Sequence, residues 1–392
     1  MNMKPYLSLA TSSWDKSEVE AIYSVIASDM YTMGEKVREY EKCFADYIGS
    51  KFAIMSNSGS SANLLMIASL FYHSSYKLSP EDEVIVPSVS WGTTYFPLQQ
   101  YGLKVKFVDI DLDTLNIDIT SLDSALTPRT KALFAVNLLG NPNNFDVLSS
   151  FCEKNSLILI EDNCESLGAE FKGKKAGTFG LMGSFSSFFS HHISTMEGGI
   201  TVTDDEELYH IMLSLRAHGW TRNLPIKNRI CQLSDDRFTE SFRFILPGYN
   251  LRPLEMSGAI GIEQLKKLPS LISARQKNAE FFTKLFSQSS KILIQKEIGA
   301  SSWFGFSLIL SHSYQGMRPK LQSILDHLNV EYRPIVTGNF AKSEVLKYFN
   351  YEISGPLDNA SYLDSNGLFI GNHHYDITAQ LSKIFYSIED IL

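Results

Sequence analysis

The chain has 392 residues, a mass of 44.1 kDa and 44% hydrophobic residues, which is ordinary for a globular protein with a sizeable core. This length suffices for one large domain and a smaller one. A formal net charge of -8 and a pI near 5.6 argue against nucleic acid or an anionic membrane as the main partner. Local basic pockets for phosphate stay possible.

The four cysteines are widely spaced, without a CxxC pair or a Cys/His cluster at metal-ligand spacing: Cys43, Cys152, Cys164 and Cys231. We therefore expect reduced thiols, no metal site and no cysteine-bound iron–sulfur cluster. The first ten residues lack the basic and apolar regions of a secretory leader, and no run of 18 apolar residues occurs. These features predict a cytoplasmic protein.

The chain opens with apolar residues at helical spacing over 17–26 and again over 36–48, which predicts two helices. A short apolar strand at 52–55, a Ser/Gly turn and a helix over 62–72 follow. Unpaired N–H groups at the start of such a helix form an anion site, so we expect Gly59 and Ser60 to bind a phosphate. An ordinary N-cap explains the serines of the turn equally well.

Four apolar strands then alternate with helical connectors, at 84–86, 105–108, 132–136 and 157–160. This spacing predicts right-handed crossovers and a mainly parallel sheet covered on both faces, with functional residues at the carboxyl ends of its strands. Trp91 follows the first of these strands. Its ring could stack on a flat heterocycle or be buried in the core.

Asp162 closes the 157–160 strand, and Glu165 follows it. A carboxylate at the end of a hydrophobic strand needs a cationic or hydrogen-bonding partner. A protonated pyridine nitrogen is such a partner, because a carboxylate that keeps it cationic turns the ring into an electron sink. The alternative is that Asp162 caps a helix.

The stretch 184–199 reads SFSSFFSHHISTMEGG and joins a β-prone run, 184–189, to an apolar strand at 200–203. We expect the first strand to deliver Ser186 and His191 to its end, in front of an acid and two glycines. The alternative is a core strand with a glycine-containing loop. No lysine occurs between Lys175 and Lys227.

Together these motifs resemble the pyridoxal-phosphate site of the DegT/StrS sugar aminotransferases, a family of aspartate-aminotransferase fold, and the resemblance runs from Leu7 to about Asn372. It implies a three-layer α/β/α PLP-dependent transferase fold with a mainly parallel large-domain sheet and a smaller α+β C-terminal domain. The expected division is an N-terminal arm and PLP-binding domain at 1–250, and a long helix and small domain at 251–392.

The resemblance also implies roles for single residues. Gly59, Ser60 and Ser186 would hold the cofactor phosphate, Trp91 would stack on the ring, and Asp162 would bind its nitrogen. His191 stands where the family has the lysine that binds the cofactor covalently, and Glu165 stands where many relatives have glutamine beside the ring hydroxyl. Both departures match the sugar 3-dehydratases of the family.

That branch implies a lyase that uses pyridoxal and pyridoxamine phosphate, with L-glutamate as amino donor and His191 as base. Its expected substrate is GDP-4-keto-6-deoxy-D-mannose, and its product is the 3,6-dideoxy sugar of colitose and O-antigen biosynthesis. A sugar 4-aminotransferase would need a lysine in 186–199, where none stands. Another nucleotide-linked 4-keto sugar is an alternative substrate, and a binding protein without catalysis would have no reason to keep Asp162, Ser186 and a histidine together.

The rest of the chain adds a predicted helix at 208–215, a loop with His218 and Arg222, and a helix at 253–268. His218 and Arg222 could reach a nucleotide diphosphate, although a solvated basic loop is the alternative. In the family, the asparagine at Asn250 crosses to the partner's cofactor phosphate, which implies a homodimer with shared sites. After a strand at 304–310, Arg333 is expected to line the sugar-nucleotide cleft.

Overall fold

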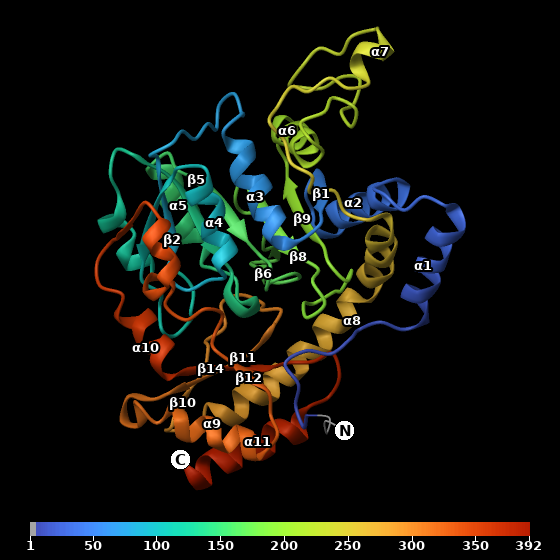
Figure 1. The fold of residues 1–392 in the computed structure, drawn as a ribbon. Helices are drawn as coiled ribbons and strands as arrows, with labels where there is room; N and C mark the ends of the chain where they lie inside the picture. Colours follow the sequence, from blue (N-terminus) through green and yellow to red (C-terminus); the bar gives the residue numbers. More distant parts are fainter. Residues whose placement is uncertain (1–4) are drawn as a thin grey trace.

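The structure is a computed structural model that describes residues 5–392. Its large domain is built on an eight-stranded sheet (Figure 1). In spatial order the strands are β1 (Phe52–Ser56), β9 (Gly199–Thr203), β8 (Met182–Ser186), β5 (Ile158–Asp162), β4 (Thr130–Val136), β2 (Glu83–Pro87), β3 (Lys104–Val108) and β13 (Tyr351–Ile353). Only β9 runs antiparallel to its neighbours, so the predicted mainly parallel sheet is confirmed.

Side chains that alternate along the strands build the cores on the two faces of the sheet. Val84 and Val86 pack in one cluster with helices α3 and α6, whereas Ile85 lies in a second cluster with α5. The large-domain helices are α1 (Lys16–Ser28), α2 (Glu35–Ile48), α3 (Gly59–Leu70), α4 (Gly92–Gln100), α5 (Phe145–Lys154), α6 (Glu206–Arg216) and α7 (Arg237–Glu240). This arrangement is the predicted three-layer fold.

A long helix, α8 (Glu255–Phe286), joins the large domain to the small one (Figure 1). The prediction ended this helix at Leu268, before Pro269, but the structure continues it through the proline. Proline removes one backbone hydrogen bond and strains the preceding turn. Packing against α1 and α2 on one half and the small domain on the other compensates for that loss.

The small domain has a four-stranded antiparallel sheet in the order β10 (Ile292–Leu293), β11 (Gly305–Leu310), β14 (Gly367–Gly371) and β12 (Tyr332–Arg333). Helices α9 (Arg318–His327) and α11 (Thr378–Ile391) share its core with the end of α8, and α10 (Asp358–Asn366) precedes β14. A two-stranded hairpin, β6 (Glu170–Phe171) and β7 (Lys174–Lys175), lies outside both sheets.

Two segments cross the division expected at residue 250. Leu7 packs in the core of the small domain, and β13 returns from the C-terminal part of the chain to pair in parallel with β3. The division therefore stays a prediction about the bulk of each domain. Within residues 5–392, no helix is both long and apolar enough to cross a membrane.

Candidate active site

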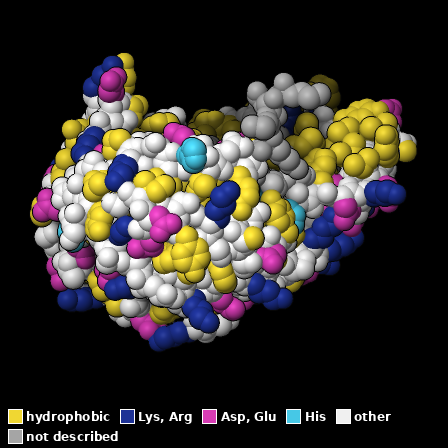
Figure 2. All heavy atoms as spheres, turned by 90° about the horizontal axis from the view of Figure 1, so that it is seen from below, with side chains coloured by type: hydrophobic (Ala, Val, Ile, Leu, Met, Phe, Trp, Pro, Cys, Tyr) yellow, Lys and Arg dark blue, Asp and Glu magenta, His cyan; other side chains and the backbone are white. Residues whose placement is uncertain are grey.

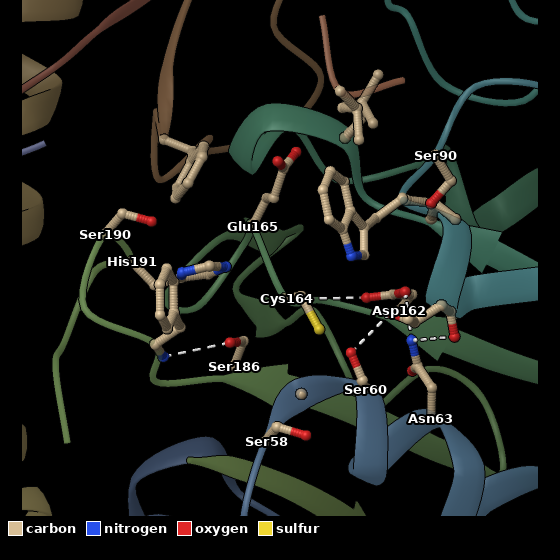
Figure 3. A pocket seen from close by; sticks show the side chains of 18 of the residues that line it. Ser58, Ser60, Asn63, Ser90, Asp162, Cys164, Glu165, Ser186, Ser190 and His191 are labelled. Atoms are coloured by element: carbon tan, nitrogen blue, oxygen red, sulfur yellow. Dashed lines mark hydrogen bonds between the residues drawn. The ribbon is translucent and has the colours of Figure 1, made fainter. Parts of the chain in front are cut away.

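A cavity of about 300 Å³ lies at the carboxyl ends of the large-domain strands (Figure 3). Residues of the small domain, Phe304 and Arg333, form part of its wall. Most of the predicted site residues line this one cavity: Gly59, Ser60, Trp91, Asp162, Glu165, Ser186, His191 and Arg333. The sheet topology thus gathers side chains from distant parts of the chain, as expected for parallel strands.

The first turn of α3 forms one end of the cavity. The Ser58 side chain accepts a hydrogen bond from the N–H of Ser61 and caps the helix, which therefore begins at Gly59 and not at Ala62 as predicted. A Cβ on Gly59 would lie 2.7 Å from Cβ of Ser186, so only glycine lets the start of α3 approach Ser186 this closely. The N–H groups of the first turn, beside the hydroxyls of Ser60 and Ser186, make a cradle suited to a phosphate.

Asp162 ends β5 and is buried at the floor of the cavity. Its Oδ2 accepts hydrogen bonds from Asn63 Nδ2 and from Thr94 Oγ1, each at 2.8 Å, and its Oδ1 accepts from the Cys164 N–H at 3.0 Å. Figure 3 shows Asn63 and Cys164 beside Asp162. It caps no helix among the described elements, and none of the described cations forms a salt bridge with it. A buried carboxylate held in this way is suited to a cationic nitrogen in the cavity.

Trp91 stands directly before α4 and leaves 58% of its surface exposed, so the alternative of a buried ring does not hold. Glu165 lies across the cavity, where its Oε2 accepts from the Leu139 N–H at 3.1 Å. Its Oε1 lies 3.8 Å from Nη2 of Arg333, whose guanidinium stacks over the Phe369 ring at 4.6 Å. Burial raises the pKa of Glu165, and the charge of Arg333 opposes that rise.

His191 lies in a turn beyond β8. The predicted strand extended to Phe189, but β8 ends at Ser186, because the next residues fold back: Ser187 N–H donates to Gly198 O, and Ser187 O accepts from Thr195 N–H. The His191 ring lines the cavity, 5.2 Å from the Phe304 ring between centroids. Its Nδ1 has no hydrogen-bond partner among residues 5–392.

Desolvation lowers the pKa of His191 to about 3, and the positive charge of Arg333 adds to this effect. The imidazole is therefore neutral at physiological pH. A neutral imidazole with a free ring nitrogen can accept a proton from a group bound in the cavity.

Three predicted residues do not line the cavity: Asn250, His218 and Arg222. They lie in the segment between α6 and α8, whose part around α7 projects from the body of the molecule (Figure 1). His218 and Asn250 lie at the base of this projection, where residues 217 and 250 pair. Asn250 is exposed and its Oδ1 accepts from Arg252 Nε at 3.0 Å, while Arg222 lies over the Trp220 ring at 4.9 Å. The role of Asn250 at a partner's cofactor and the roles of His218 and Arg222 at the nucleotide diphosphate stay predictions.

Three residues that shape the site were not predicted from the sequence: Asn63, Thr94 and Phe304. Asn63 had a signal, because it is a polar side chain within the apolar run of the predicted 62–72 helix. Thr94 and Phe304 had none, since their places depend on how α4 and the small domain pack against the sheet.

The model of the DegT/DnrJ/EryC1/StrS aminotransferase family matches residues 12–388. The chain belongs to this family. It is 61% identical over 379 residues, 96% of each chain, to a GDP-4-keto-6-deoxy-D-mannose 3-dehydratase of Yersinia pseudotuberculosis. The resemblance to the DegT/StrS group expected from the motifs is thereby confirmed.

Two solved structures of GDP-4-keto-6-deoxymannose 3-dehydratases superpose closely on this family member. One contains a trapped PLP–glutamate adduct, with a TM-score of 0.95, 59% identity and coverage of 97% of this chain and 99% of that one. The other, from E. coli, contains hydrated PLP, with a TM-score of 0.96, 59% identity and coverage of 98% and 99%.

The residues present fit pyridoxal phosphate. The first turn of α3 at Gly59, with the hydroxyls beside it, suits a phosphate, and the exposed Trp91 ring offers a stacking face. Asp162 lacks a cationic partner in the described chain. None of the residues that line the cavity is a lysine, and His191 is an imidazole base among them. The cofactor of the family therefore has a matching site here, without a side chain to bind it covalently.

Proposed function

We propose that this protein is a PLP-dependent 3-dehydratase that removes the C3 hydroxyl of GDP-4-keto-6-deoxy-D-mannose with L-glutamate as amino donor. The product is GDP-4-keto-3,6-dideoxy-D-mannose, a precursor of dideoxysugars such as colitose in O-antigen. One observation carries the proposal: an imidazole, His191, lines the cavity, and no lysine does. The relatives that are about 60% identical over nearly the whole chain are named for this reaction.

Each part of the cavity has a task. Gly59, Ser60 and Ser186 bind the cofactor phosphate, Trp91 covers one face of the ring, and Asp162 keeps the pyridine nitrogen protonated. When bound, the cofactor supplies an electron sink for the bond electrons released at the reacting carbon.

His191 accepts and returns the protons that move at the reacting carbon. Its neutral form, favoured by the low pKa, is the form that can accept them. A lysine in this place would also exchange its own amine for the amine carried by the sugar and so release an amino sugar. Imidazole cannot make that exchange, so water must remove the nitrogen as ammonia.

The atoms and electrons of this reaction balance. The sugar loses one oxygen and is reduced by two electrons. Glutamate supplies these electrons and takes up the equivalent of that oxygen, since it ends as 2-oxoglutarate and ammonia. No further oxidant or reductant is required, which agrees with a site made of the cofactor, one base and binding groups.

A homodimer with shared sites is part of the proposal. Phe238 and Phe242, 88% and 66% exposed, lie on the projecting segment around α7, and Tyr23, 65% exposed, lies on α1. Helix α1 lies on the right in Figure 1. Hydrophobic side chains gather at the same, right-hand edge of the molecule in Figure 2. Such side chains favour burial against a second copy, which would bring Asn250 to the partner's cofactor. The proposed compartment is the cytoplasm, where nucleotide sugars and glutamate are available.

The substrate is tested by offering GDP-, CDP- and dTDP-linked 4-keto-6-deoxy sugars with PLP and glutamate, followed by mass analysis of the nucleotide sugars. The proposal expects loss of one oxygen from GDP-4-keto-6-deoxy-D-mannose at a kcat/KM well above that of the other nucleotides. Deoxygenation of a CDP- or dTDP-sugar in preference to the GDP-sugar would keep the proposed reaction but contradict the proposed substrate.

A further inference from the structure

Behind the wall of the cavity, α8 buries an arginine that has no carboxylate partner. Arg275 is 7% exposed, and no described acidic residue forms a salt bridge with it. Its Nη1 donates to Phe304 O at 3.1 Å and to Asn372 O at 2.8 Å, while Nε has no partner in residues 5–392. Burying a guanidinium without a counter-charge costs folding free energy. We therefore ask what this charge does for the site beside it.

The carbonyl that Arg275 holds belongs to the residue packed against His191. The Phe304 ring lies 5.2 Å from the His191 ring and 5.7 Å from the His192 ring. The preceding residue, Trp303, has a φ of 48°, in the left-handed region that is strained for a bulky side chain. The hydrogen bond from Arg275 to the Phe304 carbonyl therefore stabilises the strained turn at 303–304. This turn sets the position of the Phe304 ring against His191.

The same turn is held from two other sides. His192 Nε2 donates to Ser302 O at 3.1 Å, and Phe304 N–H donates to Leu139 O at 3.0 Å. A Cβ on Gly140 would lie 2.6 Å from the Trp303 nitrogen, so the two backbones are in close contact. Of the groups that grip this turn, only Arg275 has a permanent charge.

Four imidazoles surround that charge. Burial lowers the pKa of His191, His192, His373 and His374 most, and the positive charge of Arg275 lowers each of them further. None of the four forms a salt bridge within the described part of the chain. The other charged groups that line the cavity with His191 are Arg333, Asp162, Glu165 and Glu197. Arg333 acts on His191 in the same direction as Arg275.

We propose that Arg275 is a positioning residue for the reaction at His191. It acts through the Phe304 carbonyl, which fixes the wall against the imidazole, and through its charge, which opposes a second positive charge on that imidazole. This inference rests on the proposed function only in taking His191 as the base.

The first test compares Arg275→Gln, which keeps a hydrogen-bond donor but no charge, with Arg275→Lys, which keeps the charge. Lys277→Met, an exposed position on the same helix, is the control. With Arg275→Gln we expect the acid limb of the kcat profile to move to a higher pH than in the wild type, while burial and Arg333 still keep the pKa of His191 below 6.5. The KM values for sugar and glutamate should change little, and Arg275→Lys should restore the acid limb.

The inference is overturned if Arg275→Gln lowers kcat by the same factor at every pH, or if Arg275→Lys shifts the acid limb as far as Arg275→Gln does. A second measurement needs no variant and no turnover: the ¹⁵N signals of the histidines of the wild-type protein, followed from pH 8 to 5. The four imidazoles around Arg275 should titrate below pH 6.5, and His191 and His373 should stay neutral down to pH 5.

Titration of these four signals near pH 6.5 would refute the role of the buried charge, even if the glutamine variant failed to fold. The two proposals fail differently. If the proposed function is wrong, the wild-type enzyme does not deoxygenate the sugar; if only this inference is wrong, turnover is intact and the histidines titrate normally.

Discussion

The side-chain amide of Asn63, one turn into α3, donates a 2.8 Å hydrogen bond to Oδ2 of Asp162 at the end of β5. Thr94 donates to the same oxygen, and the backbone of Cys164 to the other. The carboxylate is thus fixed by three neutral donors, none of which cancels its charge. The helix that begins at the phosphate cradle also orients the group that is to hold the ring nitrogen.

Replacing this carboxylate by its amide should remove most of the activity. In Asp162→Asn the side chain keeps its size but cannot stabilise a protonated pyridine nitrogen, so we expect kcat to fall at least about 100-fold, in the range seen when a preorganised electrostatic group is lost. Asn63→Ala, which removes one donor and leaves the charge, should cost much less. Steady-state kinetics on both variants measures this, and equal losses would contradict a role for the charge.

A methyl group at the phosphate cradle should weaken cofactor binding. The Cβ of Gly59→Ala would meet Ser186 Cβ at 2.7 Å and Cys164 Sγ at 3.0 Å, and such overpacking typically costs about 1–3 kcal/mol. We expect PLP to raise the melting temperature of the wild-type protein and to raise that of the variant far less. A variant with an unchanged PLP-dependent shift would place the phosphate elsewhere.

The shared-site hypothesis predicts complementation between two inactive variants. Asn250→Ala should weaken cofactor binding in the partner's site and His191→Ala should remove the base, so a mixed dimer has one site with both defects and one with neither. Unfolding and refolding the two together should restore part of the activity. A mixture of His191→Ala with His191→Asn is the matched control and should stay inactive, and full activity from a monomer would end the hypothesis.

Cofactor binding should be non-covalent in the wild type and covalent in His191→Lys. Borohydride should leave no pyridoxyl group on the wild-type chain, whereas the variant should yield a peptide with the group on residue 191. The trapped cofactor should also slow deoxygenation in that variant. Digestion and mass spectrometry decide this, and a pyridoxyl-lysine elsewhere in the wild-type chain would remove the basis for assigning His191.

Stability should fall in mild acid through His373. Its Nε2 donates to Ser8 O and its Nδ1 accepts from Thr11 Oγ1, and burial lowers its pKa from 6.5 to about 4. Between these pH values the unfolded chain binds more protons at this histidine than the folded chain does. The contribution of His373 to the free energy of unfolding is therefore fully present above pH 6.5 and decreases as the pH drops toward 4. At pH 5 this loss amounts to about 2 kcal/mol.

Urea unfolding at pH 7.5 and pH 5 measures this loss. His373→Gln keeps a donor but cannot titrate, so it should lose less stability over that interval than the wild type. His312→Gln, a change at an element end outside the core, serves as a control and should follow the wild type. An identical pH dependence for wild type and His373→Gln would contradict the lowered pKa.

The sequence predicts the parts of this structure that local patterns determine. Apolar runs such as 84–86 locate the central strands, and the Ser/Gly turn before α3 locates the anion site. It does not predict β13, whose residues 351–353 become a strand only because the edge of β3 is there to pair with them. Pro269 likewise predicts the end of a helix, but α8 continues through it, because tertiary packing outweighs the local preference of proline.

Within the site, the residues at strand ends could be predicted and those that arrive from other layers could not. Asp162 and Ser186 follow from their places after buried strands. Phe304 and the unpaired charge of Arg275 depend on how the small domain and α8 meet the large sheet. Asn250 does not line the cavity of its own subunit, so its role depends on a second subunit that the sequence alone does not place.

Because His191 replaces a lysine, the amino nitrogen of glutamate should leave as ammonia and not stay on the sugar. The most direct test follows this nitrogen and the C3 oxygen of the sugar together. GDP-4-keto-6-deoxy-D-mannose is incubated with the enzyme, PLP and ¹⁵N-glutamate, and ammonia, 2-oxoglutarate and the sugar are quantified. We expect one ¹⁵N-ammonia and one 2-oxoglutarate for each sugar that loses its C3 oxygen, with no ¹⁵N on the sugar. A ¹⁵N-labelled 4-amino sugar that keeps its C3 hydroxyl, formed without ammonia, would contradict this expectation.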